Sequence, residues 1–235
     1  MALIKLTAIV DNISGKLNGT VFANNKGGHY IRSKSNPTNP RTHHQAGIRA
    51  KFGAIASKWR ELTQSERNAW DAAAENFPYT NRLGDTKILS GFALHQQLNN
   101  NLSLTTAAAD LAGPPLPQGV GAVESAFGDY LTRNPEPLFE VHFDTIGKRA
   151  GTQVLMYATA AMSPGIQNFT NQLRLLTVID TGLSGTTMID ATELYNLRFG
   201  APAAGTKIGI GLRVVNTTTG EASAMYTYAA EVIQP

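Results

Sequence analysis

Cysteine is absent from the 235 residues of this sequence. Its absence excludes a disulfide-stapled scaffold, a thiolate metal site and a cysteine nucleophile. Charged residues make up only 16% of the chain, and no window approaches eighteen consecutive apolar residues, so we expect neither a membrane span nor a membrane partner. The first ten residues lack the long apolar region of a secretory signal. The 42% of apolar residues is a globular composition, sufficient for a core without staples.

Patterns that mark catalytic or cofactor sites are also missing. The sequence contains no HExxH, GxSxG, P-loop or GxGxxG motif. Among the five histidines, His43 and His44 are adjacent, and adjacent side chains do not point the same way, so a shared metal ion is not expected. The acidic residues are too scattered to indicate a catalytic pair. We therefore expect a protein that is not an enzyme and that has no cofactor and no metal site.

The charges that are present are distributed unevenly along the chain. Residues 1–100 hold 13 Lys and Arg against 6 Asp and Glu, a balance of +7, whereas residues 101–235 hold 7 against 11, a balance of −4. Between Asp11 and Glu61 there are nine basic side chains and no acid. Such a run attracts phosphates or an acidic subunit, although an ordinary solvated face explains the same charges. Our candidates for an anionic or inter-subunit contact are Lys16, Arg32, Lys34, Arg41, Arg49 and Lys51.

Residues 1–104 are predicted to form a basic anchoring region of strands and helices. Strand-like runs at Leu3–Val10 and Gly19–Ser33, separated by turn signals, predict a β-hairpin or short meander. Apolar residues spaced three and four apart between Ile48 and Leu62 predict a helix.

Two further helices are predicted from their starts. Thr63 and Glu66 have the spacing of a capping box, and the helix that follows should end before Pro78. Ser90 is a candidate cap for a third helix. Buried aromatic residues dominate small cores, so the core of this region is expected to contain Phe52, Trp59, Leu62, Trp70 and Phe77.

The rest of the chain has a different pattern. Residues 105–137 are predicted to be a Pro/Gly-rich linker, because the stretch Gly113–Gly119 cannot continue a helix. Residues 138–235 alternate with a period of two, apart from one expected helix at Asp190–Phe199. Six or seven short strands predict an immunoglobulin- or fibronectin-like sandwich. The predicted fold class is therefore α+β, an N-terminal β-hairpin with two or three helices followed by an all-β sandwich.

A local pattern offers a nucleic-acid alternative. The stretch Lys58–Trp70 looks like the second helix and turn of an HMG-box, a module that binds the DNA minor groove. The match covers about twenty residues, and the basic first arm and long third helix of that module are missing. A capped pair of helices with two core tryptophans explains the same residues. Nucleic acid therefore stays a secondary partner, with binding that would fall steeply with salt.

A broader resemblance covers most of the chain. The segments ISGKLNGTVF, KGGHYIR and NPTNPRT at residues 13–42, followed by W-x-x-L-T-x-x-x-R-x-A-W at Trp59–Trp70 and LSGF at Leu89–Phe92, resemble a phage-associated family of mostly uncharacterised virion proteins. These motifs are structural, and no active site comes with them. The resemblance implies a multi-copy virion protein, assembled in the bacterial host cytoplasm, whose partners are other capsid or tail subunits.

The sequence leaves four functions open. The first is a capsid-associated protein, either a minor capsid component or a decoration protein, that docks through its basic N-terminal half. The second is a structural protein of the tail, neck or baseplate, where sandwich domains also occur. The third is a DNA-binding packaging or architectural protein. A carbohydrate-binding adhesin is a fourth reading, which clustered exposed aromatic residues would favour.

Overall fold

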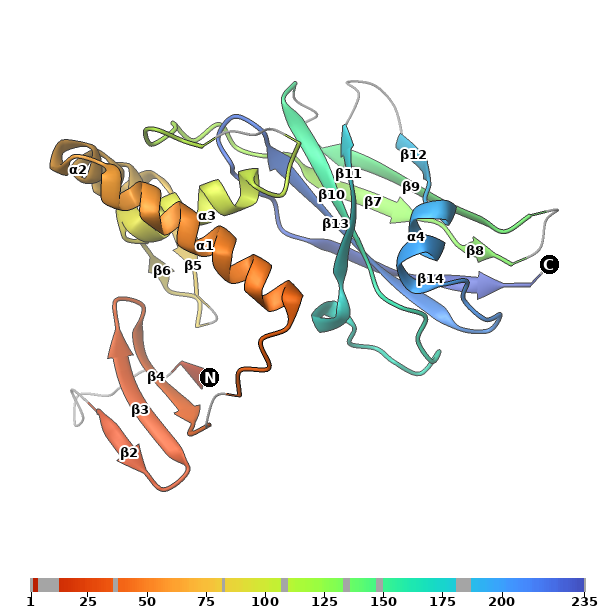
Figure 1. Ribbon diagram of the computed structural model, residues 1–235, viewed down its shortest axis with the longest axis horizontal. Coiled ribbons are helices and arrows are strands. Elements are labelled where there is room, and N and C mark those ends of the chain that lie inside the picture. Colours follow the sequence, from red (N-terminus) through yellow and green to blue (C-terminus); the bar gives the residue numbers. More distant parts are fainter. Residues whose placement is uncertain are drawn as a thin grey trace. The chain divides into compact units, whose positions relative to one another are not determined.

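The chain folds into two compact units, which are described separately. The computed structural model describes residues 2–3, 13–35, 38–81, 83–106, 110–132, 136–146, 150–180 and 187–234. Contacts between Cα atoms group residues 1–94 into an N-terminal unit and residues 95–235 into a C-terminal unit. The first contains a small sheet and helices, and the second contains a large sheet (Figure 1). The predicted α+β class is therefore present.

The N-terminal unit begins with a small antiparallel sheet in the order β1-β4-β3-β2. Its strands are β1 (Ala2–Leu3), β2 (Gly15–Leu17), β3 (Thr20–Asn25) and β4 (Gly28–Ser33). Strands β3 and β4 form the predicted hairpin, because Gly28, at φ +110°, adopts a backbone conformation that other residues avoid. Most of the predicted strand Leu3–Val10 lies outside the described residues.

The helices of this unit start at side-chain caps, two of which, at Thr63 and Ser90, were predicted. Helix α1 (His43–Glu61) begins at Thr42, whose hydroxyl accepts a hydrogen bond from the Gln45 N–H. Helix α2 (Gln64–Ala73) begins at the Thr63–Glu66 capping box and continues into a 3₁₀ turn, η1 (Ala74–Asn76). The short strands β5 (Tyr79–Thr80) and β6 (Thr86–Lys87) then pair before α3 (Gly91–Leu102), and the Ser90 hydroxyl accepts from the Ala93 N–H in α3.

The predicted core of this unit is only partly correct. Trp70 is fully buried, and Trp59, Leu62 and Phe77 are partly buried. The Trp59 ring lies edge-on to Phe92 of α3, with ring centroids 5.6 Å apart. Phe52 is 54% exposed, so its assignment to the core was wrong. The apolar stripe of α1 is buried or half-buried from Ile55 onward, and Ile48 and Phe52 in its earlier turns are exposed.

The C-terminal unit contains one eight-stranded sheet in the order β11-β10-β13-β14-β8-β9-β12, with β7 pairing on β9. All pairs are antiparallel except β8 with β14. The strands are β7 (Ala122–Phe127), β8 (Tyr130–Leu131), β9 (Leu138–Ile146), β10 (Thr152–Ala158), β11 (Arg174–Asp180), β12 (Thr187–Asp190), β13 (Lys207–Asn216) and β14 (Tyr226–Ile233). A 3₁₀ turn, η2 (Thr170–Gln172), precedes β11, and α4 (Thr192–Phe199) follows β12.

One hydrophobic core contains residues of β9 together with residues of β10 and β13. Phe139, Val141 and Phe143 of β9 belong to the same buried cluster as alternate residues of β10 and β13. Helix α4 contributes Tyr195, whose ring centroid lies 5.6 Å from that of Phe139. The period of two in the sequence therefore identifies the residues that point into this core.

The predicted boundaries at 104 and 137 differ from the observed division. The division falls between Leu94 and His95, inside α3. The second half of α3 is fixed to the C-terminal unit because the Asn101 side-chain amide donates to the Gly220 carbonyl, at 2.8 Å. The predicted linker 105–137 contains strands β7 and β8, which pair with β9 and β14.

Candidate functional site

All six predicted contact residues are exposed and lie in the N-terminal unit. Lys16 of β2 and Arg32 of β4 both face Val21 of β3 in the strand register. Residues opposite each other in antiparallel strands point to the same face, so the two bases flank Val21 in one row. Val21 is only 7% exposed. This face of the small sheet therefore combines an apolar centre with two flanking positive charges.

The segment between β4 and α1 carries two more of the predicted bases. The Lys34 N–H donates to the Gly19 carbonyl at 2.7 Å, which fixes the end of β4. Arg41 has a positive φ of 51°. The Asn39 side-chain oxygen accepts from the Arg41 N–H at 3.3 Å and from the Arg49 guanidinium at 2.8 Å. Asn39 therefore holds Arg41 and Arg49 at the start of α1.

The first turns of α1 form a second basic and apolar surface, which we call the α1 surface. It consists of Ile48, Arg49, Lys51 and Phe52. Ile48 is 53% exposed and Phe52 is 54% exposed. Side chains three and four positions apart are neighbours on a helix, so Lys51 borders Ile48, Arg49 borders Phe52, and the two apolar residues border each other. Acidic residues are absent from the first turn of this helix. The α1 surface is thus apolar and positively charged.

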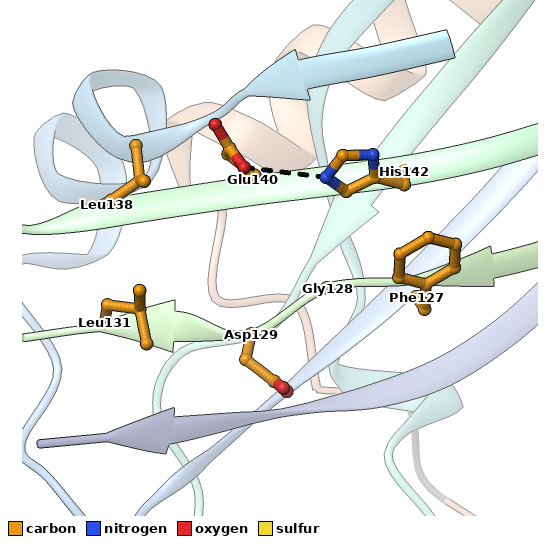
Figure 2. A pocket seen from close by; sticks show the side chains of 7 residues that line it. All are labelled: Phe127, Gly128, Asp129, Leu131, Leu138, Glu140 and His142. Atoms are coloured by element: carbon orange, nitrogen blue, oxygen red, sulfur yellow. Dashed lines mark ion pairs between the residues drawn. The ribbon is translucent and has the colours of Figure 1, made fainter. Parts of the chain in front are cut away.

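A pocket in the C-terminal unit was not predicted from the sequence. It has a volume of about 250 Å³ and is lined by Phe127, Gly128, Asp129, Leu131, Leu138, Glu140 and His142. Phe127 and His142 stand at one end and Leu131 and Leu138 at the other, with Glu140 between them (Figure 2). The alternation in β9 could have placed Glu140 and His142 on the outer face. Phe127 was missed because it lies in the predicted linker.

The side chains of this pocket are held in a defined arrangement. The Phe127 and His142 rings are stacked in parallel, with centroids 4.9 Å apart and an interplanar angle of 1°. Glu140 Oε2 lies 3.5 Å from His142 Nε2. The Asp129 carboxylate accepts a hydrogen bond from the Glu231 N–H of β14, at 2.8 Å. The pocket therefore holds two carboxylates in different roles: Glu140 lies beside the His142 ring, and Asp129 stabilises the strand pairing.

The backbone beneath the pocket depends on a glycine. Gly128 has a φ of +151°, and a Cβ atom there would lie 2.0 Å from the Glu140 carbonyl oxygen. Only glycine allows the β7–β8 connection to pass this close to β9. This close approach brings Phe127 and Asp129 to opposite sides of one short turn.

In the part of the chain that the structure describes, no group of three or more His, Asp or Glu side chains could hold a metal ion. None of the helices described there has the length and apolar character needed to cross a membrane. The surfaces that remain can bind a charged or apolar partner by complementarity.

Comparisons of the chain with protein-family models, with curated proteins and with solved structures found no match.

Proposed function

We propose that this chain is a non-enzymatic structural protein of a bacteriophage particle, associated with the capsid as a minor or decoration component. The observation that carries this proposal is the α1 surface, where Ile48 and Phe52 are more than half exposed beside Arg49 and Lys51. Exposed apolar side chains gathered on one helix face are typical of a surface that a partner covers. The sequence resemblance to phage-associated virion proteins supports the same function.

The partner of this surface should be an acidic protein surface with an apolar centre. Positive charges bordering an apolar patch attract negative charges and orient them before the patch is buried. On the small sheet, Lys16 and Arg32 add two exposed positive charges on one face, on either side of the buried Val21. Both surfaces lie in the N-terminal unit, which supports the assignment of docking to this half of the chain.

Incorporation into particles tests this proposal. Phage that carry Arg49→Gln and Lys51→Gln should assemble particles with at least about tenfold less of this chain, because each lost contact weakens docking. The matched control replaces the exposed Arg174 and Arg198 of the C-terminal unit by Gln, which removes the same charge. Equal incorporation of the two double variants would contradict docking through α1.

Two alternatives make different predictions for the same particles. A tail, neck or baseplate protein would be present in threes or sixes, whereas a capsid protein would follow the copy number of the shell lattice. The unopposed bases between Asp11 and Glu61 favour the DNA-binding alternative as well. That alternative predicts retention on DNA at low salt that falls steeply as salt rises.

We also propose that the C-terminal unit is an immunoglobulin- or fibronectin-like sandwich. The order of its strands supports this: β7, β9 and β12 pair with one another as strands A, B and E do. Strands β11, β10, β13 and β14 follow the order C′, C, F and G. An experimental structure in which these two groups formed one open layer would contradict the proposal.

A further inference from the structure

The outer face of strands β7, β9 and β12 carries two adjacent rows of side chains that no function described so far uses. Phe127, His142 and Met188 are aligned across the three strands by the register. Glu140 and Asp190 lie opposite each other in the next row. Phe127 is 61% exposed and Met188 is 56% exposed. We call these five residues the acidic–aromatic face.

The acidic row of this face is electrostatically unfavourable in the isolated chain. Like charges directly opposite each other in a sheet are destabilising. The Asp190 carboxylate accepts from the Thr192 N–H at 2.9 Å, which holds it at the start of α4. The ion pair found for Glu140 is the one with His142, and the other residues that line the pocket carry no positive charge. A positively charged ligand would relieve the repulsion.

The chemistry of the face selects a lysine or arginine side chain. A cation is attracted to the face of an aromatic ring and to a carboxylate, and the pocket offers both in Phe127 and Glu140. Leu131 and Leu138 at the other end can contact the aliphatic stem of such a side chain. The volume of about 250 Å³ is small enough to favour one side chain over a larger molecule.

We infer that this face binds the basic N-terminal unit of a second copy of the chain. The balance of +7 over residues 1–100 and of −4 over residues 101–235 makes the two ends of the molecule complementary. The contact joins different surfaces of the two copies, so it is heterologous and continues head to tail into a ring or a filament. The inference rests on the proposed function, because it names the acidic partner of the docking unit.

Sedimentation of the purified full-length chain at low ionic strength tests this contact. Wild-type protein at up to about 100 μM should form oligomers, and Glu140→Gln should weaken self-association at least about tenfold. Phe127→Ala should weaken it about three- to tenfold through the lost ring. Glu124→Gln is the matched control, because Glu124 is an exposed acid of β7 outside the pocket and its loss should leave association unchanged.

A mixing experiment separates head-to-tail contact from every other mode. One variant is Glu140→Gln, which keeps its basic unit. The other replaces all six candidate bases by Gln (Lys16, Arg32, Lys34, Arg41, Arg49 and Lys51) and keeps its acidic–aromatic face. At a concentration where wild type associates and neither variant does so alone, their mixture should form a one-to-one complex and nothing larger, because each supplies one intact surface. Circular dichroism checks that both variants are folded.

Several results would overturn this inference. They are a monomeric wild-type chain, self-association that Glu140→Gln leaves unchanged, loss of association in Glu124→Gln as well, and a mixture that stays monomeric. The last result would indicate that the bases contact acids of their own chain. These experiments use no phage particle, so the proposed function stands or fails separately, on the presence of the chain in particles.

Discussion

Trp70 and Phe52 are both large aromatic residues of the N-terminal unit, and they differ in burial. Trp70 is fully buried and Phe52 is 54% exposed. Truncation of a buried Trp leaves a cavity, so Trp70→Ala should lower the free energy of unfolding by about 3–5 kcal/mol. Phe52→Ala should lower it by less than about 1 kcal/mol. Urea denaturation of the two variants measures both values, and a larger loss for Phe52→Ala would contradict the burial described above.

Glu66 gives the capping box a dependence on pH. The hydroxyl of Thr63 and then its N–H donate to the Glu66 carboxylate, at 2.8 and 2.7 Å, and these hydrogen bonds lower its pKa from the usual 4.5. A carboxyl with a lowered pKa in the folded state stabilises that state above its unfolded pKa, and the contribution is lost as pH falls through the folded value.

Thermal unfolding as a function of pH tests this cap. Glu66→Gln should be less stable than wild type at neutral pH, and the difference should shrink as the pH falls below 4.5 and through the lowered value. Glu75→Gln is the control, because Glu75 lies in η1 outside the capping box, and it should show no such trend. A difference that stays constant from neutral to acidic pH would argue against the cap as the cause.

At the scale of elements, the contact between α3 and the β13–β14 turn depends on Gly220. A Cβ atom at Gly220 would lie 2.4 Å from the Leu98 carbonyl oxygen, and its φ is +73°. Gly205 has a similar φ of +76°, but a Cβ atom there would meet nothing within 4 Å. Both glycines carry the strain of a positive φ when substituted, but only substitution of Gly220 adds a steric clash. Comparing them separates the free-energy cost of the clash from that of the backbone conformation.

Alanine substitution of these glycines gives a paired prediction. Gly205→Ala should cost about 1 kcal/mol, from backbone strain alone. Gly220→Ala should cost about 2 kcal/mol more, because α3 must move away from the turn. Melting temperatures of the two variants compare the costs. Equal shifts would show that α3 does not approach the turn as closely as described.

The same scale explains which parts of the fold could be predicted from the sequence. The starts of α2 and α3 were predictable because local side chains define them, as Thr63 and Ser90 do. Strands β7 and β8 were not, because a Pro/Gly-rich stretch resembles a linker whether or not distant strands pair with it. The exposure of Phe52 was also beyond prediction, since the stripe on α1 shows that a face is apolar but not how much of it is covered.

The candidate sites also divide into those that local sequence predicts and those that depend on contacts between distant residues. Exposure of the six bases agrees with the long run of unopposed charge, which is a local property of the sequence. The acidic–aromatic face depends on the register of β7, β9 and β12, which brings Phe127, His142 and Met188 together from distant parts of the sequence. Composition and spacing contain no information on that register.

At the scale of the whole molecule, the two units have opposite charge balances. We propose that the basic unit docks onto the particle and that the C-terminal unit is presented at its surface. Both depend on the chain being part of a particle and present in many copies.

Quantitative mass spectrometry of purified phage particles tests this central claim most directly. The proposal predicts that the chain is present in intact particles at a constant ratio to the major shell protein, with the copy number of a lattice position. Its absence from particles, when it is abundant in the infected cells that produced them, would contradict the proposed function.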